Sequence, residues 1–249
     1  MNEAVVTAGM LAIGDELLSG RTRDRNIGHL ASVMTLVGID LREVRIVGDE
    51  TSEIVDAVNA LRARYTYVFT SGGIGPTHDD ITADAIAAAF RVGIGHDPRA
   101  MALLTAHYAR RDIEFTEARR RMARIPAGAD LIDNPVSVAP GFRIGNVHVM
   151  AGVPAVFEAM LDAVVPTLKT GAPMLSAAVD SPYPEGTIGG PLAAVQKDHP
   201  DTAIGSYPRY GEVGYSTQIV IRSRDAAAVE AARLDVVAML ARIGEGGPA

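Results

Sequence analysis

The first half of the chain alternates short apolar runs with longer amphipathic runs, and this alternation constrains the fold more than any other feature. The apolar runs predict strands at 5–13, 40–48 and 66–71. The intervening runs repeat apolar residues every three to four positions and predict helices at 25–38, 52–65 and about 82–90. Strands that alternate with helices predict a mostly parallel sheet covered on both faces, a three-layer α/β/α fold.

The α/β pattern continues to about residue 168 and changes after it. A helical reading covers 97–124, two short apolar pieces follow, and a helix at 155–165 closes the α/β unit near residue 168. After the linker "KTGAP" the order becomes β-α-β-β-α, ending in a long amphipathic run that Asp225 is expected to cap. This order predicts a small α+β subdomain on the ferredoxin-like theme. We therefore expect two domains, 1–170 and 171–249.

Three glycine-containing loops follow predicted strands: "IGDELLSG", "TSGGIGPTHDD" and "AGVP". Ligands of open parallel sheets bind at the carboxyl ends of the strands, so the three loops are expected to form one pocket. Gly72, Gly73 and Gly75 permit close backbone approach, and their N–H groups next to a helix start are a natural anion cradle. The spacing matches neither a P-loop nor a dinucleotide-binding fingerprint.

Acidic residues gather at the same predicted edge. Asp79 and Asp80 follow the glycines, Asp15 and Glu16 follow the first strand, and Asp49 follows the second. An anion cradle beside carboxylates is the arrangement expected where a divalent cation such as Mg²⁺, Mn²⁺ or Co²⁺ bridges carboxylate and phosphate. The residues thus predict a site for a small phosphorylated ligand.

Structural alternatives exist for several of these residues. Asp79, Asp80 or Thr82 could simply cap the following helix, although one cap does not account for two carboxylates beside a glycine loop. Asp24 could cap the helix that begins near residue 25. An arginine stripe, with a predicted Glu117–Arg121 pair, is more typical of a solvated helix face than of a phosphate site; its members are Arg110, Arg111, Arg119, Arg120, Arg121 and Arg124.

Composition excludes several functional classes. The chain carries a net charge of −7, which disfavours nucleic acid as a partner because that interaction needs a basic surface. It has no cysteine, so disulfides, thiolate metal sites and a cysteine nucleophile are excluded. No apolar stretch is long enough to span a membrane and no leader is visible, which predicts a cytoplasmic protein without a membrane partner.

The strings "GDELLSGRTRDRN", "VGDE" and "TSGGIGPTHDDITADA" resemble the molybdopterin-binding (MoaB/Mog-like) domain family. "GGIGPTHDD" is most similar to the competence/damage-inducible protein A branch and to the N-terminal domain of eukaryotic FAD synthase. "HPDTAIGSYPRYGE" strengthens the comparison with FAD synthase. One departure is that the family's "PGxPxEM" segment reads "AGVPAVFEAM" here. Gly152 and Pro154 match, whereas Glu158 is displaced and receives no role.

The resemblance implies the three-layer fold, a homo-oligomer, and either molybdopterin or a nucleotide pyrophosphate as ligand. It places Asp80 on the family's motif aspartate and Asp79 on the second acid of the competence branch. Together with the loop chemistry, it predicts the catalytic residues Asp80 and Asp79 and the metal ligands Asp80, Asp79 and Asp15. The predicted ligand-binding residues are Gly14, Asp15, Glu16, Asp49, Gly72, Gly73, Gly75, Pro76, Thr77, Thr82, Gly152 and Pro154.

Two functions from different classes remain open at this point. The first is metal-dependent hydrolysis of a nucleotide pyrophosphate such as ADP-ribose or FAD, in which a cation activates water and the glycine amides neutralise the phosphoryl oxygens. The second is a molybdopterin-binding module or carrier without hydrolytic activity. A third reading, an interaction protein with a vestigial pocket, is disfavoured by the intact glycines and acids.

Overall fold

A computed structural model of the protein describes residues 5–211 and 214–245. The chain divides into two compact units, Met1–Gly171 and Ala172–Ala249, each with its own hydrophobic core. No helix of the described residues is both long and apolar enough to cross a membrane.

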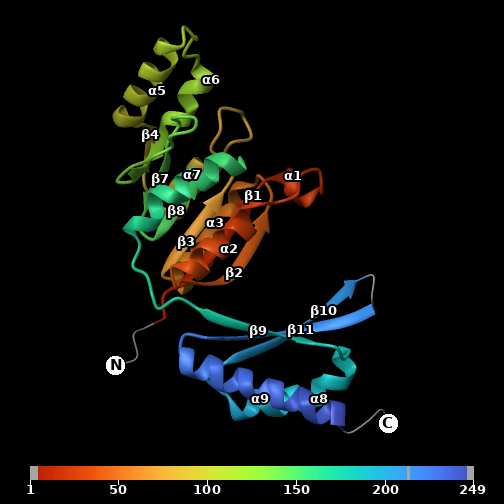
Figure 1. Ribbon diagram of the computed structural model, residues 1–249. Coiled ribbons are helices and arrows are strands. Elements are labelled where there is room, and N and C mark those ends of the chain that lie inside the picture. Colours follow the sequence, from red (N-terminus) through yellow and green to blue (C-terminus); the bar gives the residue numbers. More distant parts are fainter. Residues whose placement is uncertain (1–4, 212–213, 246–249) are drawn as a thin grey trace. The chain divides into compact units, whose positions relative to one another are not determined.

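The N-terminal unit is built on a six-stranded sheet with the order β2-β1-β3-β8-β7-β6 (Figure 1). The strands from β2 to β8 in this order are parallel; β7 pairs antiparallel with β8, and β6 pairs antiparallel with β7. The predicted mostly parallel α/β fold is therefore confirmed. The strands are β1 (Thr7–Ile13), β2 (Asp40–Val47), β3 (Tyr67–Ser71), β6 (Asp130–Ile132), β7 (Gly141–Ile144) and β8 (Val147–Met150).

Helices cover both faces of this sheet because the side chains of its central strands alternate between two cores. Leu11 and Val68 face one core, which α3, α4 and α5 complete. Met10 and Phe69, their neighbours in sequence, face the other, which α2 and α7 complete. The helices are α1 (Asp15–Leu18), α2 (Asn26–Leu36), α3 (Thr51–Arg64), α4 (Thr82–Phe90), α5 (Pro98–Arg110), α6 (Glu117–Arg120) and α7 (Pro154–Val164), with the 3-10 turns η1 (Arg121–Ala123) and η2 (Val165–Thr167).

The region predicted as one helix at 97–124 is interrupted, so that prediction is wrong. The helix α5 ends at Arg110, and Asp112 turns the chain with a left-handed φ of 54°. After α6 and η1, the strand β5 (Arg124–Pro126) pairs antiparallel with β4 (Ile94–His96). We call residues 94–126 the excursion; Figure 1 shows its helices projecting beside the main sheet. The strand β7 was also missed, because four residues after a proline carry no readable period.

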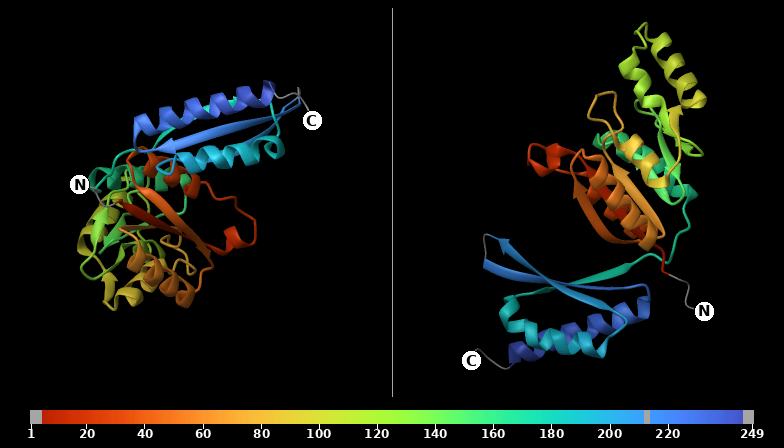
Figure 2. Two further views of the ribbon diagram at one scale, coloured as in Figure 1. Left: turned by 90° about the horizontal axis from the view of Figure 1, so that it is seen from below. Right: turned by 180° about the vertical axis from the view of Figure 1, so that it is seen from behind.

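The C-terminal unit has the predicted β-α-β-β-α order and adds a small antiparallel sheet, β10-β11-β9. Both of its helices pack on the sheet through one core (Figure 2). As predicted, Asp225 caps the last helix, accepting a 2.8 Å hydrogen bond from the N–H of Ala227. The elements are β9 (Leu175–Ser181), α8 (Glu185–Asp198), β10 (Ala203–Gly211), β11 (Gly214–Ser223) and α9 (Ala226–Glu245).

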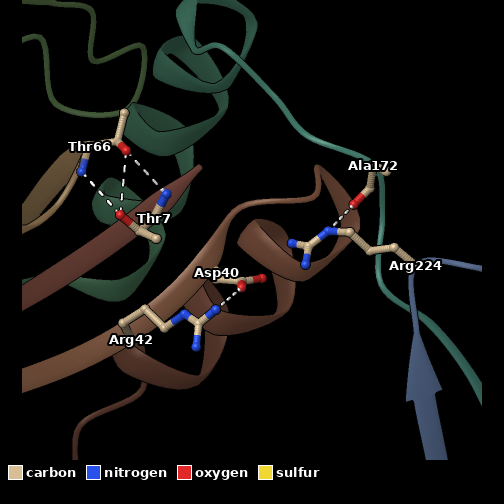
Figure 3. A network of polar contacts seen from close by, with 6 residues as sticks. All are labelled: Thr7, Asp40, Arg42, Thr66, Ala172 and Arg224. Carbon is tan, nitrogen blue, oxygen red and sulfur yellow. Dashed lines mark hydrogen bonds and ion pairs between the residues drawn. The ribbon is translucent and has the colours of Figure 1, made fainter. Parts of the chain in front are cut away.

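Polar contacts tie down the strand starts, at the end of the sheet away from the glycine loops (Figure 3). Thr7 and Thr66 exchange hydrogen bonds between backbone N–H and hydroxyl, each of 3.3 Å, where β1 and β3 begin. Arg42 pairs with Asp40 at the start of β2. Within the C-terminal unit, Arg224 Nε donates to the carbonyl of Ala172 at 3.0 Å and so joins the end of β11 to the segment before β9.

Candidate functional site

The parallel strands bring the three glycine-containing loops to one edge of the sheet. Gly14 donates its N–H to the carbonyl of Val47, and Gly72 donates to that of Met150, at 3.1 and 3.2 Å. These bonds join the ends of β1 to β2 and of β3 to β8. Figure 1 shows the 72–81 loop rising from this edge, with α1 on one side and the excursion on the other.

The glycines are required first by the protein's own packing. Gly72 has a φ of 110°, and a Cβ there would collide with the carbonyl oxygen of Ile13. Gly73 has a φ of 68°, and a Cβ there would collide with the hydroxyl of Thr82. Thr82 itself is fully buried and donates that hydroxyl to the carbonyl of Gly72 at 3.0 Å. Its position therefore indicates a structural part in holding the loop on α4.

The same loop leaves backbone donors unused. Within the described residues, the N–H groups of Gly73, Ile74 and Gly75 donate to no protein acceptor, whereas the neighbouring N–H groups of Gly72 and Thr77 are both bonded. Consecutive unpaired amides in a tight loop are the feature that binds phosphate and other anions in proteins. The loop can accordingly serve as the predicted anion cradle.

Asp80 folds back onto the loop and does not cap α4. Its carboxylate accepts the backbone N–H of Thr77 at 2.8 Å and also the Thr77 hydroxyl. The helix α4 begins after Ile81 with no side-chain cap, so the capping alternative for Asp79, Asp80 and Thr82 is wrong. Asp80 also lines a cavity of about 20 Å³, which we call the glycine-loop cavity, together with Gly73, Gly75, Arg121 and Arg124.

The other acids form a separate group at the ends of β1 and β2. Asp15 donates its N–H to the Asp49 carboxylate at 3.0 Å, and Asp49 returns a longer bond of 3.4 Å to the Asp15 carboxylate. Burial raises the pKa of Asp49, and repulsion by Asp15, Glu16 and Asp79 raises it further. The carboxylate of Asp79, on the 72–81 loop, is therefore within electrostatic reach of this group.

Asp79 differs from the other acids in its exposure. Its side chain is 62% exposed and lies 3.9 Å from His78. The polar Thr77 side chain nearby, and the backbone N–H of Asp79 itself, lower its pKa. An exposed carboxylate that stays ionised is available to a ligand or a cation at the tip of the loop.

Glu16, Gly152 and Pro154 line a different hollow, of about 50 Å³, which we call the asparagine hollow. At its centre lies Asn26, which is 3% exposed and which the sequence analysis did not select. Its Nδ2 donates to the Ser71 hydroxyl at 2.7 Å and to the Gly152 carbonyl at 2.8 Å, while its buried Oδ1 has no partner. Asn26 thus joins the start of α2 to the end of β3 and to the loop after β8, and nothing in the local sequence distinguished it from an ordinary first-turn residue.

Two arginines of the excursion reach the site, which the solvated-face interpretation did not expect. Arg121 and Arg124 border the glycine-loop cavity and also a larger hollow of about 510 Å³, which we call the arginine hollow; its other lining residues include Pro76, His78 and His96. The predicted Glu117–Arg121 pair is wrong, because Glu117 pairs with Arg120 at 3.6 Å. The interpretation of Asp24 as a cap is confirmed by a 2.8 Å bond from the N–H of Ile27.

The described part of the chain contains no group of three or more acidic or histidine side chains arranged to hold a metal ion. The predicted metal ligands fall instead into two places: Asp15 beside Asp49, and Asp79 with Asp80 on the loop. All are carboxylates, the donors that Mg²⁺ and Mn²⁺ prefer. A cation here would need oxygens from a ligand or water to complete its coordination.

Two family models match the chain, one in each unit. Residues 9–170 match the probable molybdopterin binding domain. The chain belongs to this family. Residues 173–244 match the middle domain of FAD synthase, which confirms the resemblance noted in the C-terminal segment.

The chain is also similar in sequence to individual proteins, one of them of known structure. The chain is 32% identical to a protein of Aeropyrum pernix over 96% of this chain and 92% of that one. It is 35% identical to a protein of Pyrobaculum arsenaticum over 83% and 82% of the two chains. A crystal structure of the protein CinA with unknown function from Thermoplasma acidophilum is 33% identical, covers 65% of this chain and 96% of that chain, and has a TM-score of 0.60.

Proposed function

We propose that this member of the molybdopterin-binding domain family is a metal-dependent hydrolase of a nucleotide pyrophosphate of the ADP-ribose or FAD type. The observation that carries the proposal is the run of unpaired amides at Gly73, Ile74 and Gly75 beside an exposed, ionised Asp79. Amides bind phosphoryl oxygens, and carboxylates bind the cation that accompanies them. Neither group has another evident use in the fold.

The acidic group suits a divalent cation. Asp15, Glu16 and Asp79 each raise the pKa of Asp49 by repulsion, and a bound cation would offset that repulsion. Asp15 and Asp49 are the carboxylates that would hold it, with oxygens of the ligand and of water completing its coordination; Asp79 lies within electrostatic reach, and Asp80 fixes the loop that carries Asp79. When bound, such a cation polarises the pyrophosphate and lowers the pKa of water.

In the proposed reaction, a water oxygen bonds to one phosphorus, and the bond from that phosphorus to the bridging oxygen breaks. The leaving phosphate keeps the electron pair, and the proton of the water passes to solvent or a carboxylate. The amides at 73–75 stabilise the charge on the phosphoryl oxygens. Asp79 accepts a hydrogen bond from the attacking water, and Asp80, through Thr77, keeps the loop in shape.

Incubation with ADP-ribose or FAD in the presence of Mg²⁺, Mn²⁺ or Co²⁺ tests the proposal, with release of AMP as the readout. We expect turnover that chelator abolishes and that Asp79→Asn lowers by about a hundredfold, the size typical of a lost catalytic group. Asp162→Asn, on the exposed face of α7, is the matched control and should leave turnover unchanged. No AMP with any of the three cations would reject the hydrolase.

A second candidate is a molybdopterin-binding module without hydrolytic activity. The family match and the unpaired, buried Oδ1 of Asn26 in the asparagine hollow favour it, because pterin rings carry amino and ring N–H donors. Thermal unfolding with a panel of pterins, nucleotides and cations separates the two, since a ligand that binds only the folded state raises the midpoint. Stabilisation by a pterin with inert pyrophosphates would support the module.

We also expect three properties of the whole protein. These are assembly into a homo-oligomer, a cytoplasmic location and the absence of a nucleic-acid or membrane partner. Sedimentation of the purified protein would test the first of them.

A further inference from the structure

The arginine hollow and the glycine-loop cavity share two residues, Arg121 and Arg124, and these two differ in how their charges are compensated. Arg124 forms a two-pronged ion pair with Asp84, with nitrogen–oxygen distances of 2.6 and 2.9 Å. Both side chains are about one third exposed. The charge of Arg124 is therefore already neutralised within the protein.

Arg121 has no such partner. Within the described residues, its one side-chain hydrogen bond runs from Nη2 to the backbone carbonyl of Asp80, at 3.2 Å. Its Nε is buried and donates to nothing, and within the described residues no carboxylate lies within ion-pair distance of it. A guanidinium held by a neutral carbonyl, with a buried donor unsatisfied, is electrostatically incomplete.

The position of Arg121 indicates which kind of group could neutralise its charge and accept its unsatisfied hydrogen bond. Its side chain borders both the arginine hollow and the glycine-loop cavity, and residues 73–75, whose amides are unpaired, line that cavity as well. An anion with two adjacent charged groups can place one on the amides and the other on the guanidinium. The arginine hollow, at about 510 Å³, has room for the second group and what is attached to it.

We propose that Arg121 is the specificity-determining residue that selects diphosphate over monophosphate ligands, by binding the phosphate that the glycine loop does not hold. Arginine suits this role because its fork presents parallel donors to phosphate oxygens. The inference rests on the proposed function for its substrate class, but it concerns binding and is tested without turnover. In hydrolysis, the same contact would neutralise the charge that the leaving phosphate gains.

The test is isothermal titration calorimetry with inorganic pyrophosphate and with inorganic phosphate, in buffer that contains chelator. Wild type should bind pyrophosphate at least tenfold more tightly than phosphate. Arg121→Gln should lower pyrophosphate affinity tenfold or more and leave phosphate affinity within twofold. Arg110→Gln, an exposed arginine at the end of α5 that lines neither hollow, should change neither affinity.

A role confined to holding the Asp80 carbonyl would weaken phosphate and pyrophosphate alike, and that result would overturn the proposal. So would equal affinities in wild type, or a pyrophosphate affinity of Arg121→Gln within twofold of wild type. If Arg121→Gln does not fold, Arg121→Lys replaces it. That variant keeps the charge without the fork and should lose at least threefold in pyrophosphate affinity alone.

The outcomes also separate this inference from the hydrolase. If wild type releases no AMP from ADP-ribose and Arg121→Gln selectively loses pyrophosphate binding, the role of Arg121 in binding is supported and hydrolysis is rejected. Turnover of ADP-ribose with a kcat/KM that Arg121→Gln leaves unchanged supports the hydrolase and rejects the proposed role of Arg121 in selecting diphosphates.

Discussion

At position 72 a single methyl group decides whether the candidate site can form. Gly72 sits against the carbonyl of Ile13 with a φ that L residues rarely adopt. The same backbone carries the N–H that joins β3 to β8. Because the unpaired amides of residues 73–75 lie on the same loop, strain at Gly72 would distort the candidate site directly.

We therefore expect Gly72→Ala to lower the free energy of unfolding by about 3 kcal/mol or more, from strain and collision together. Gly28→Ala is the matched control, because Gly28 is exposed in α2 with open space around it. That change should raise the free energy of unfolding by about 0.5–1 kcal/mol. Urea denaturation measures both, and equal effects of the two substitutions would contradict this account of the loop.

His148 is the residue whose titration the fold changes most. It lies buried in β8, stacked on Phe69 with ring centres 5.2 Å apart, and burial lowers its pKa to about 4. The unfolded chain binds a proton near pH 6.5, so stability is fully present above that pH and falls as the pH drops toward 4. Between pH 7 and pH 4 the loss amounts to roughly 3 kcal/mol.

Replacing His148 by Phe should remove this part of the pH dependence. The measurement is the free energy of unfolding in urea at pH 7 and pH 4 for both proteins. The difference between them should change by roughly 3 kcal/mol across that range. A constant difference would show that His148 keeps its ordinary pKa in the folded protein.

At the scale of elements, a partly buried ion pair joins the excursion to α4, in addition to its apolar contacts with the core. Arg124, at the start of β5, binds Asp84 in the first turn of α4 through two bonds. A second pair, Arg143 with Asp130, joins β7 to β6 at 2.6 Å but is more exposed, at 47% and 64%. The two pairs share their chemistry and differ in burial.

Arg124→Met should therefore cost about 1–2 kcal/mol of stability, because it leaves the Asp84 carboxylate partly buried without its partner. Arg143→Met should cost less than about 1 kcal/mol, since water replaces the lost partner. Thermal unfolding of the two variants makes the comparison. Equal losses would mean that burial does not govern the strength of these pairs.

At the scale of the whole molecule, the two units have separate cores and match separate family models, with the change between residues 170 and 173. All predicted site residues, and Arg121 and Asn26 as well, lie in the N-terminal unit. Each unit should consequently fold by itself, and the candidate site should not need the second unit to form.

We expect fragments 1–171 and 172–249 each to unfold cooperatively in thermal melts followed by circular dichroism. Fragment 1–171 should bind pyrophosphate within threefold of the full chain. A fragment 1–171 that folds but does not bind would show that the C-terminal unit contributes to the site. A fragment that does not fold would contradict the independence of the cores.

The sequence alone was sufficient for the layered architecture and for the loops of the site. β1 and β3 are buried along almost their whole length because successive side chains enter opposite cores, so they are visible in the sequence as continuous apolar runs, whereas the helices bury residues every three to four positions. The glycines and acids were visible for a related reason: polar and conformationally special residues directly after buried strands have few structural uses.

Only the tertiary structure decided which polar residues meet. Arg121 reaches Asp80 because β4 pairs with β5 and returns the chain 41 positions later to the same loop. Asn26 joins Ser71 and Gly152 across 45 and 126 positions. Such contacts depend on packing between distant segments, which leaves no local period or composition to read. They distinguish a solvated arginine from one, such as Arg121, that borders the glycine-loop cavity.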